Sequence, residues 1–133
     1  MDKLEQVCII DDDPIYIFGA KRMIQKAEVC ESIMVYRNGK EAFESLHALY
    51  QAQVKLPDVI LLDLNMPIWD GWQFLDEFTK IPIEQKIILY IVTSSVDPAD
   101  MEKAKKYALV SNFVVKPITS ESIRSMFDPI LGK

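Results

Sequence analysis

Hydrophobic residues gather in five short runs along the chain, at residues 7–10, 33–36, 59–62, 87–92 and 113–115. Four of these runs are continuous rather than alternating and are rich in Val and Ile. That pattern is typical of strands buried on both faces of a parallel sheet. The run at 33–36 follows a serine and precedes an arginine, which favours an edge strand.

The segments between these runs carry single apolar stripes with helical spacing. The stripes are Ala20, Met23, Ile24 and Ala27; Phe43, Leu46 and Tyr50; Phe74, Leu75 and Phe78; Met101, Ala104 and Ala108; and Ile123, Met126, Phe127 and Ile130. Asp13-Pro14 and Asp97-Pro98 place a capping residue before a proline, as at a helix start. Asn38-Gly39 and Asp70-Gly71 predict turns.

A strand followed by a helix, repeated along the whole chain, predicts an α/β protein with an open, doubly wound parallel sheet and right-handed crossovers. The sequence has no linker, internal repeat or low-complexity segment, and the last predicted helix lies at the chain end. We therefore expect residues 1–133 to form a single domain with no output domain.

Composition narrows the classes of function. The chain has 133 residues and a net charge of −5, and its acidic surface disfavours direct contact with nucleic acid or anionic lipid. It shows no signal peptide, and its longest apolar run is too short to span a bilayer. Cys8 and Cys30 form no CxxC motif, and Cys8 is expected to be a buried apolar residue. These features predict a cytoplasmic location and no membrane insertion.

Polar residues that could bind a ligand or take part in a reaction follow the predicted strands. They are Asp11, Asp12 and Asp13 after the first strand, Asp63 after the third, Thr93 after the fourth and Lys116 after the fifth. Because the carboxyl ends of parallel strands share one rim, these side chains are expected to meet there. Crowded carboxylates raise at least one pKa, and a divalent cation relieves that cost. Oxygen ligands favour Mg²⁺, Mn²⁺ or Ca²⁺, and Mg²⁺ leaves room for a phosphate oxygen.

This set of groups points to phosphoryl chemistry. A carboxylate can attack phosphorus and form an acyl phosphate. The transition state spreads negative charge over the phosphoryl oxygens, so it needs positive or hydrogen-bonding partners. Lys116 offers an ammonium group and Thr93 a hydroxyl group.

Four segments, in this order, resemble the motifs of receiver domains of two-component response regulators, such as the bacterial chemotaxis response regulator. They are residues 9–14 (IIDDDP), 59–67 (VILLDLNMP) with Asp70-Gly71, 92–94 (VTS) and 113–117 (FVVKP). Together they cover nearly the whole chain. The resemblance is to a stand-alone receiver domain, with a flavodoxin-like (βα)5 sheet of five parallel strands in the order 2-1-3-4-5 and helices on both faces.

The resemblance implies a role for each acidic residue. Asp63 is the implied phosphoacceptor. Asp12 is implied to bind Mg²⁺ directly and Asp11 mostly through a metal-bound water, while Asn65 offers its backbone carbonyl. Mn²⁺ or Ca²⁺ is an expected substitute for Mg²⁺.

It also implies how the signal leaves the site. Thr93 and Lys116 contact the phosphoryl oxygens, Phe113 changes rotamer together with Thr93, and the Lys116-Pro117 bond is cis.

The resemblance further implies the partners. The phosphoryl donor is a sensor histidine kinase or a histidine phosphotransfer protein. The phosphorylated form signals to a separate effector protein through its fourth helix, fifth strand and fifth helix. The chain is then a signalling phosphoacceptor rather than an enzyme, with self-catalysed transfer and slow self-dephosphorylation, and a monomer or weak dimer.

Other residues receive structural interpretations. Asp13 is expected to cap a helix rather than bind metal. Asn112 stands where many receivers have glycine, and it also tolerates left-handed backbone. The segment 48–56 is long for a connection into the third strand. His47, Trp69 and Trp72 are expected to be surface or packing residues. Candidate positions for the partner surface are Lys103, Lys105, Lys106, Tyr107 and Arg124.

Three alternatives remain open at this point. A phosphohydrolase of the haloacid dehalogenase type would place its nucleophile at Asp11 and would leave the segment at 59–67 unexplained. A flavodoxin-like electron carrier needs a flavin-phosphate loop after the first strand, where this chain has three aspartates. A receiver relic that works without phosphorylation is the third alternative.

Overall fold

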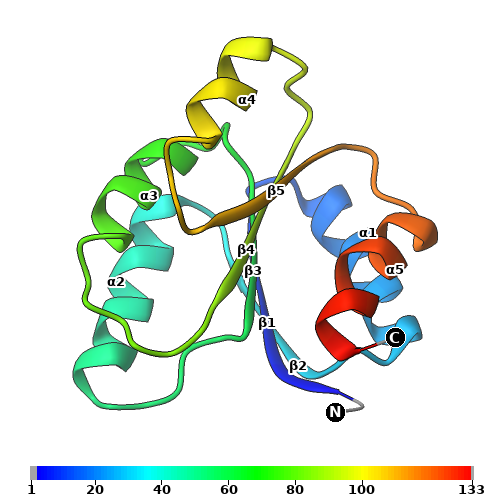
Figure 1. The fold of residues 1–133 in the computed structure, drawn as a ribbon, viewed down its shortest axis with the longest axis horizontal. Helices are drawn as coiled ribbons and strands as arrows, with labels where there is room; N and C mark the ends of the chain where they lie inside the picture. Colours follow the sequence, from blue (N-terminus) through cyan, green and yellow to red (C-terminus); the bar gives the residue numbers. More distant parts are fainter. Residues whose placement is uncertain (1–2, 133) are drawn as a thin grey trace.

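Five parallel strands form the central sheet of the computed structural model, which describes residues 3–132. The strands are β1 (Leu4–Ile10), β2 (Cys30–Tyr36), β3 (Val59–Leu62), β4 (Ile88–Thr93) and β5 (Val110–Val115). Their order in the sheet is β2-β1-β3-β4-β5. The predicted flavodoxin-like sheet is therefore confirmed, and residues 33–36 lie in an edge strand as expected (Figure 1).

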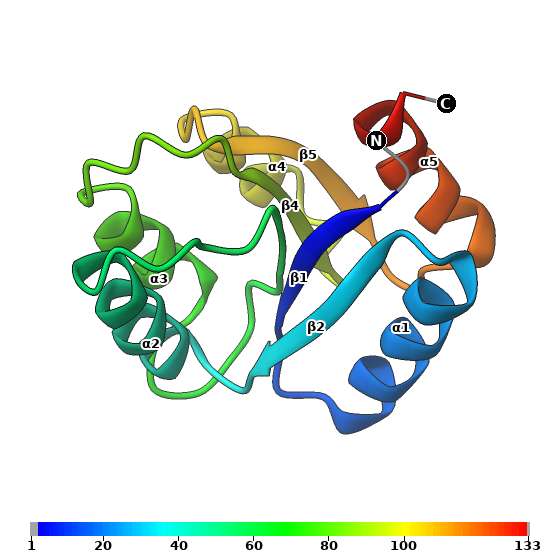
Figure 2. The same ribbon diagram turned by 90° about the horizontal axis from the view of Figure 1, so that it is seen from below.

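Helices cover both faces of this sheet. They are α1 (Pro14–Ala27), α2 (Gly39–Gln51), α3 (Gly71–Phe78), α4 (Pro98–Ala104) and α5 (Ser120–Leu131). Figures 1 and 2 show α1 and α5 on one side of the sheet and α2 and α3 on the other. Within the described range, no helix combines the length and the apolar character that crossing a membrane requires.

The central strands are buried on both faces, which explains their continuous apolar runs. Val7 and Ile9 of β1 pack with α1 and α5, whereas Cys8 and Ile10 pack with α2 and α3. All four side chains are fully buried. Because successive strand residues point to opposite faces, one strand contributes side chains to two separate cores.

Strand β5 departs from the prediction for residues 113–115. It pairs only with β4 and forms the second edge of the sheet, so its residues are half-buried or exposed. The strand begins at Val110, and Ser111 interrupts the ladder with β4. A run with few polar residues was therefore wrongly interpreted as a strand buried on both faces. The fourth helix is also shorter than predicted, because it ends at Ala104 and leaves Ala108 outside.

The capping residues behave as their side chains dictate. Asp13 and Asp97 cap α1 and α4, as predicted. Asn38 and Asp70, which were predicted to mark turns, are instead the N-caps of α2 and α3. Their side-chain oxygens accept hydrogen bonds from backbone N–H groups three residues later, at 2.8 and 2.9 Å. The same side chains serve turns and caps, so the prediction of turns was wrong for a local reason.

The segment at 48–56 is tied to the connection between α3 and β4. Gln85 donates to the Leu56 carbonyl at 2.8 Å and accepts from the Leu56 N–H at 2.9 Å. The hydroxyl group of Tyr50 donates to the carbonyl of Pro82 at 3.3 Å. The extra length therefore brings two loops together at the end of the sheet where β3 and β4 begin.

Packing roles are found for both tryptophans and for His47. Trp72 stacks on Tyr107 with ring centroids 5.7 Å apart, and Trp69 lies 5.5 Å from the ring of Phe43. The half-buried His47 stacks on Phe43 at 5.3 Å. These contacts agree with the structural interpretation of all three residues.

Gly71 lies where the chain between β3 and α3 packs against itself. A Cβ atom at this position would stand 2.5 Å from the carbonyl oxygen of Asp63 and 3.0 Å from the Cα atom of Leu64. The Gly71 N–H donates to the Leu64 carbonyl at 2.9 Å. Because the crowding atoms belong to the backbone, they have little freedom to move aside.

We predict that Gly71→Ala lowers the free energy of unfolding by roughly 1–3 kcal/mol, because the added methyl group overpacks this connection. Gly19→Ala is the matched control, since no atom lies within 4 Å of its added Cβ. That variant is expected to raise stability by about 0.5–1 kcal/mol, as an alanine inside a helix does. Urea unfolding of both variants is the measurement. Equal midpoints for the two would contradict the crowding at Gly71.

Candidate functional site

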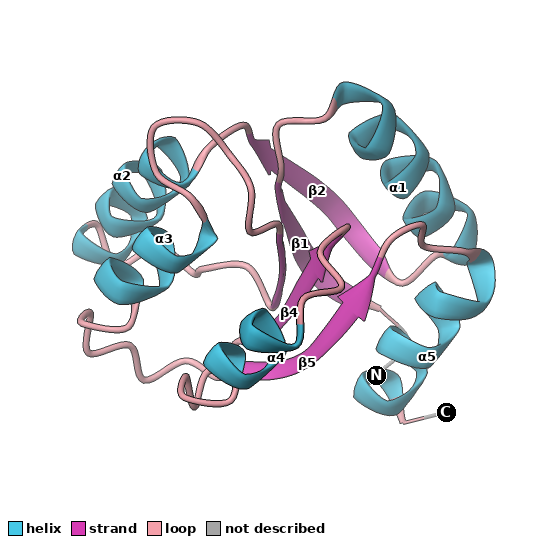
Figure 3. Ribbon diagram, turned by 90° about the horizontal axis from the view of Figure 1, so that it is seen from above, coloured by secondary structure: helices cyan, strands magenta, loops and turns pink. Residues whose placement is uncertain are grey.

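Three acidic side chains meet at the rim formed by the carboxyl ends of the strands. Asp11 and Asp12 follow β1 and Asp63 follows β3, and one carboxylate oxygen of each lies within 4.8 Å of the others. Asp11 and Asp63 are 1% and 6% exposed, whereas Asp12 faces solvent. Figure 3 shows this end of the sheet and the loops around it. The predicted acidic cluster is therefore present.

Backbone hydrogen bonds orient the two buried carboxylates. Oδ1 of Asp11 accepts from the Asp13 N–H at 2.9 Å, and Oδ1 of Asp63 accepts from the Leu64 N–H at 2.8 Å. The main chain of each acid continues a strand ladder, because Asp63 N–H donates to the Ile10 carbonyl at 2.9 Å and Asp11 N–H to the Tyr36 carbonyl at 3.0 Å. The second oxygen of each carboxylate, Oδ2, is the one close to Lys116.

Lys116 brings a positive charge to the same place. Its Nζ lies 2.7 Å from Oδ2 of Asp11 and 3.7 Å from Oδ2 of Asp63, and its side chain is 15% exposed. The Lys116-Pro117 peptide bond is cis, as expected from the family resemblance. The backbone N–H of Lys116 donates to the carbonyl of Thr93 at 2.8 Å, which joins the ends of β4 and β5.

The electrostatics of the cluster favour an added cation. Burial raises the pKa of Asp11, the hydrogen bond from Lys116 opposes this, and the charge of Asp63 adds to it. With all groups ionised, one ammonium faces three carboxylates. Hard oxygen ligands grouped this closely suit a divalent cation such as Mg²⁺.

Thr93, Asn65 and Phe113 complete the set of predicted residues. Thr93 ends β4 and is fully buried, and its hydroxyl oxygen accepts from the Ser95 N–H at 3.4 Å. Asn65 is exposed in the loop after β3, and Phe113 is half-buried on β5 beside Ile91 of β4. Their positions follow from the strand order. Their roles remain predictions.

Asp13 and Asn112 have local roles. The exposed Asp13 carboxylate accepts from the Ile15 N–H at 3.0 Å and so caps α1, as predicted. The cluster of carboxylate oxygens that could hold a metal ion, as found in the described chain, does not include Asp13. Asn112 does not use its tolerance for left-handed backbone, because it lies in β5, where its side-chain oxygen accepts from the N–H of Phe113 at 2.8 Å.

One residue beside the site was not predicted from the sequence. Tyr16, in the first turn of α1, places its ring centroid 4.2 Å from Nζ of Lys116. Its hydroxyl is buried and has no hydrogen-bond partner among the described residues. The available signal was its place in the helix that starts directly after the acidic residues.

The candidate partner residues separate into different environments. Lys103 lies over the ring of Trp72 at 4.7 Å, and the hydroxyl of Tyr107 donates to Asp76 at 2.6 Å. Burial and the nearby carboxylates raise the pKa of Tyr107 to about 12. Lys105 pairs with Glu102 at 2.9 Å. Lys103 and Tyr107 therefore contact α3 as well as belonging to the region around α4.

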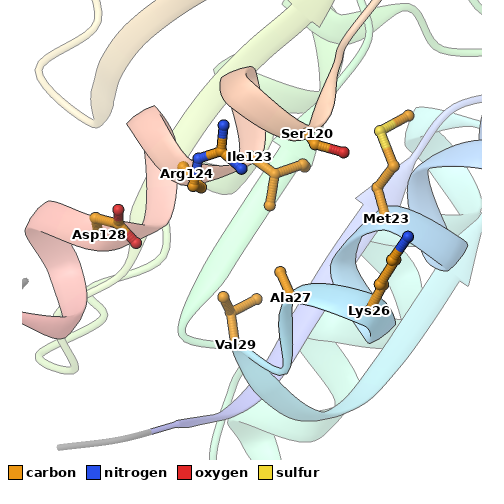
Figure 4. Close-up of a pocket in the computed structure, with 8 residues that line it drawn as sticks. All are labelled: Met23, Lys26, Ala27, Val29, Ser120, Ile123, Arg124 and Asp128. Carbon is orange, nitrogen blue, oxygen red and sulfur yellow. The ribbon is translucent and has the colours of Figure 1, made fainter.

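Arg124 belongs to a groove between α1 and α5. Figure 4 shows the residues that line it, which are Met23, Lys26, Ala27, Val29, Ser120, Ile123, Arg124 and Asp128. None of the acidic residues at the strand ends takes part in this groove. Arg124 thus lies on the α1 side of α5, away from the contacts made by α4.

Comparisons with known proteins agree with this geometry. The model of the response regulator receiver domain family matches residues 7–128. The crystal structure of a two-component response regulator from Cytophaga hutchinsonii is 32% identical, with a TM-score of 0.86, and the match covers 98% of this chain and 99% of that chain.

Two further proteins show the range of the similarity. The nitrate/nitrite response regulator protein NarL of Escherichia coli K12 is 25% identical over 90% of this chain, which spans 63% of that protein. The Mn²⁺-bound form of response regulator Rcp1 shares the fold at 20% identity, with a TM-score of 0.75 and coverage of 95% of this chain and 91% of that chain. The fold, the acidic cluster and the family match lead to one conclusion: this chain belongs to the response regulator receiver domain family.

Proposed function

We propose that this chain is a receiver that accepts a phosphoryl group on Asp63 and signals to a separate protein. The observation that carries the proposal is the position of the buried Asp63 carboxylate between two further acids and the ammonium group of Lys116. The donor is a sensor histidine kinase or a histidine phosphotransfer protein. The protein acts in the cytoplasm as a monomer or weak dimer.

The acidic cluster fits a divalent cation, with Mg²⁺ as the natural occupant and Mn²⁺ or Ca²⁺ as substitutes. Asp11, Asp12 and Asp63 offer carboxylate oxygens within 4.8 Å of one another. The family resemblance adds the backbone carbonyl of Asn65 as a further ligand. When bound, the cation supplies positive charge that offsets the crowded carboxylates and the phosphoryl oxygens. The Mn²⁺-bound form of Rcp1 supports this choice of metal.

Asp63 has one oxygen free for nucleophilic attack. Its Oδ1 is held by the Leu64 N–H, so Oδ2 is the atom that attacks phosphorus. A phosphorus–oxygen bond forms to Oδ2 as the phosphorus–nitrogen bond of the phosphohistidine donor breaks, and the imidazole leaves with that electron pair. Lys116 stands 3.7 Å from the attacking oxygen and donates to the phosphoryl oxygens. In this proposal the residues of the receiver itself catalyse the transfer from the donor to Asp63.

The same residues carry the signal away from the site. The hydroxyl group of Thr93 turns to the phosphoryl group, and the half-buried ring of Phe113 moves inward with it. A groove between α4 and β5, lined by Met101 and Phe113 among others, changes shape as a result. This is a local charge event that biases two packing arrangements of one surface, the surface of α4, β5 and α5.

Loss of the phosphoryl group is slow and needs no partner enzyme. A water molecule attacks phosphorus as the bond from phosphorus to the Asp63 oxygen breaks, which releases inorganic phosphate and restores the carboxylate. Its path passes the residues two positions beyond Asp63 and Thr93, which are Asn65 and Ser95. Ser95 is engaged locally, because its hydroxyl donates to Asp100 at 2.6 Å. Asn65 is exposed at the rim.

We predict that acetyl phosphate and Mg²⁺ together produce a single phosphoryl adduct in the intact mass spectrum. The adduct is absent without Mg²⁺ and absent in Asp63→Asn, and hydroxylamine removes it because it is an acyl phosphate. Asp13→Asn is the matched control, since this neighbour lies outside the acidic cluster and asparagine still caps a helix. An adduct that persists in Asp63→Asn, or steady turnover of acetyl phosphate with no adduct, would sink the proposal.

Mg²⁺ is also expected to stabilise the unphosphorylated fold. At tenfold excess over the dissociation constant, binding adds about 1.4 kcal/mol, or an increase in Tm of about 4–8 °C for a domain of this size. Asp12→Asn should lose this response without loss of stability in EDTA, because Asp12 is exposed. Asp13→Asn should keep it. Calorimetry with and without Mg²⁺ is the measurement, and an unchanged response in Asp12→Asn would remove Asp12 from the metal site.

A further inference from the structure

Within residues 3–132, the ammonium group of Lys116 makes two ionic contacts and one contact with an aromatic ring. Asp11 and Asp63 approach Nζ at 2.7 and 3.7 Å, and the ring of Tyr16 lies under it with the centroid at 4.2 Å. Among the described residues, the other two cation–π pairs are longer, at 4.7 and 5.5 Å. The lysine therefore lies between two carboxylates and one aromatic face.

A bound divalent cation would compete with Lys116 for the carboxylates but not for the aromatic ring. Both carboxylates belong to the acidic cluster, where a divalent cation draws on the same oxygens that hold Lys116. An uncharged ring offers no such ligand, so its hold on the ammonium group persists when a cation binds. Because Lys116 is only 15% exposed, the contact lies in the partly desolvated setting where cation–π interactions are strongest.

The hydroxyl group of Tyr16 is not needed for this contact. It is buried and has no hydrogen-bond partner within the described chain. Burial and the charges of Asp11 and Asp63 raise its pKa, so the phenol stays neutral. A phenylalanine ring would offer the same face to Lys116 and would remove an unpaired polar atom.

The first turn of α1 places the ring of Tyr16 beside the site. Asp13 caps the helix, Pro14 occupies its first position, and Tyr16 follows in the first turn. The Asp13 N–H also donates to Asp11 at 2.9 Å, so one short segment orients both the acid and the ring. This gives the third aspartate of the acidic run a role in the geometry of the site, although it does not belong to the metal cluster.

We propose that Tyr16 is a positioning residue for phosphoryl transfer, and that its ring face holds the Lys116 ammonium group beside Asp63. The inference rests on the proposed function, since it assigns a role within that reaction. The ring acts through Lys116 and does not itself touch the phosphoryl group.

The test compares the wild-type protein with Tyr16→Phe, which keeps the ring, and with Tyr16→Met and Tyr16→Leu, which remove it. Initial phosphorylation rates are measured over a range of acetyl phosphate concentrations at saturating Mg²⁺. The maximal rate of the Phe variant is expected to stay within about twofold of wild type, whereas Met and Leu lose roughly 5- to 30-fold, the range of one desolvated cation–π contact. The half-saturating acetyl phosphate concentration changes little.

Two further readouts separate positioning from general damage to the fold. The methylene protons of Lys116 should show an upfield ring-current shift in the NMR spectra of wild type and Tyr16→Phe, and should lose it in Tyr16→Met. The Mg²⁺ dissociation constant should stay within about threefold in all variants, because the strand ends place the acids. Using two non-aromatic variants keeps the test decisive if one of them folds poorly.

Each outcome decides the proposal. If the maximal phosphorylation rate of Tyr16→Phe falls as far as that of Tyr16→Met, the effect belongs to the hydroxyl group, and the role of the ring is overturned. If Tyr16→Met and Tyr16→Leu are phosphorylated at the wild-type rate, the positioning role of Tyr16 is overturned, while Asp63 remains the phosphoacceptor. A wild-type protein that takes no phosphoryl group would overturn the proposed function and this inference together.

Discussion

The ion pair between Lys116 and Asp11 is the contact on which the rest of the site depends. It joins residues 105 positions apart in the chain, and the two strands that end there are separated in the sheet by β3 and β4. A buried carboxylate beside a second one is costly without a counter-charge close by, and removing one partner of such a pair leaves an uncompensated charge. The acidic rim therefore exists only if the whole sheet keeps its strands in place.

The register of the sheet makes this arrangement possible. Ile10 of β1 pairs with Leu62 of β3, so the next residue of each strand, Asp11 and Asp63, emerges at the same level. Both strands are buried on two faces, and the apolar side chains of the two cores anchor them. Hydrophobic burial on either side thus offsets the repulsion between carboxylates at the rim. The crowded charges and the continuous apolar runs therefore have the same cause, which is the position of β1 and β3 in the centre of a parallel sheet.

This link explains how much of the fold and the site could be predicted from the sequence. Central strands follow from apolar runs, and the rule that ligands bind at the carboxyl ends of strands is enough to bring Asp11, Asp63 and Lys116 together. The order 2-1-3-4-5 already placed β5 at an edge. Its burial was still overestimated, because a short apolar run looks the same at an edge and at the centre. Tyr16 was missed for a different reason. Its contact depends on the direction in which the Lys116 side chain leaves β5, and no local pattern encodes that direction.

Helix α4 is held on two sides by contacts that begin near the acidic rim and at α3. The loop after β4 links Thr93 to this helix, since Ser95 donates to Asp100 in its first turn. On its other side, the residues that follow α4 are held to α3 by the stacking of Tyr107 on Trp72 and by the bond from Tyr107 to Asp76. The short helix α4 is therefore anchored on both sides.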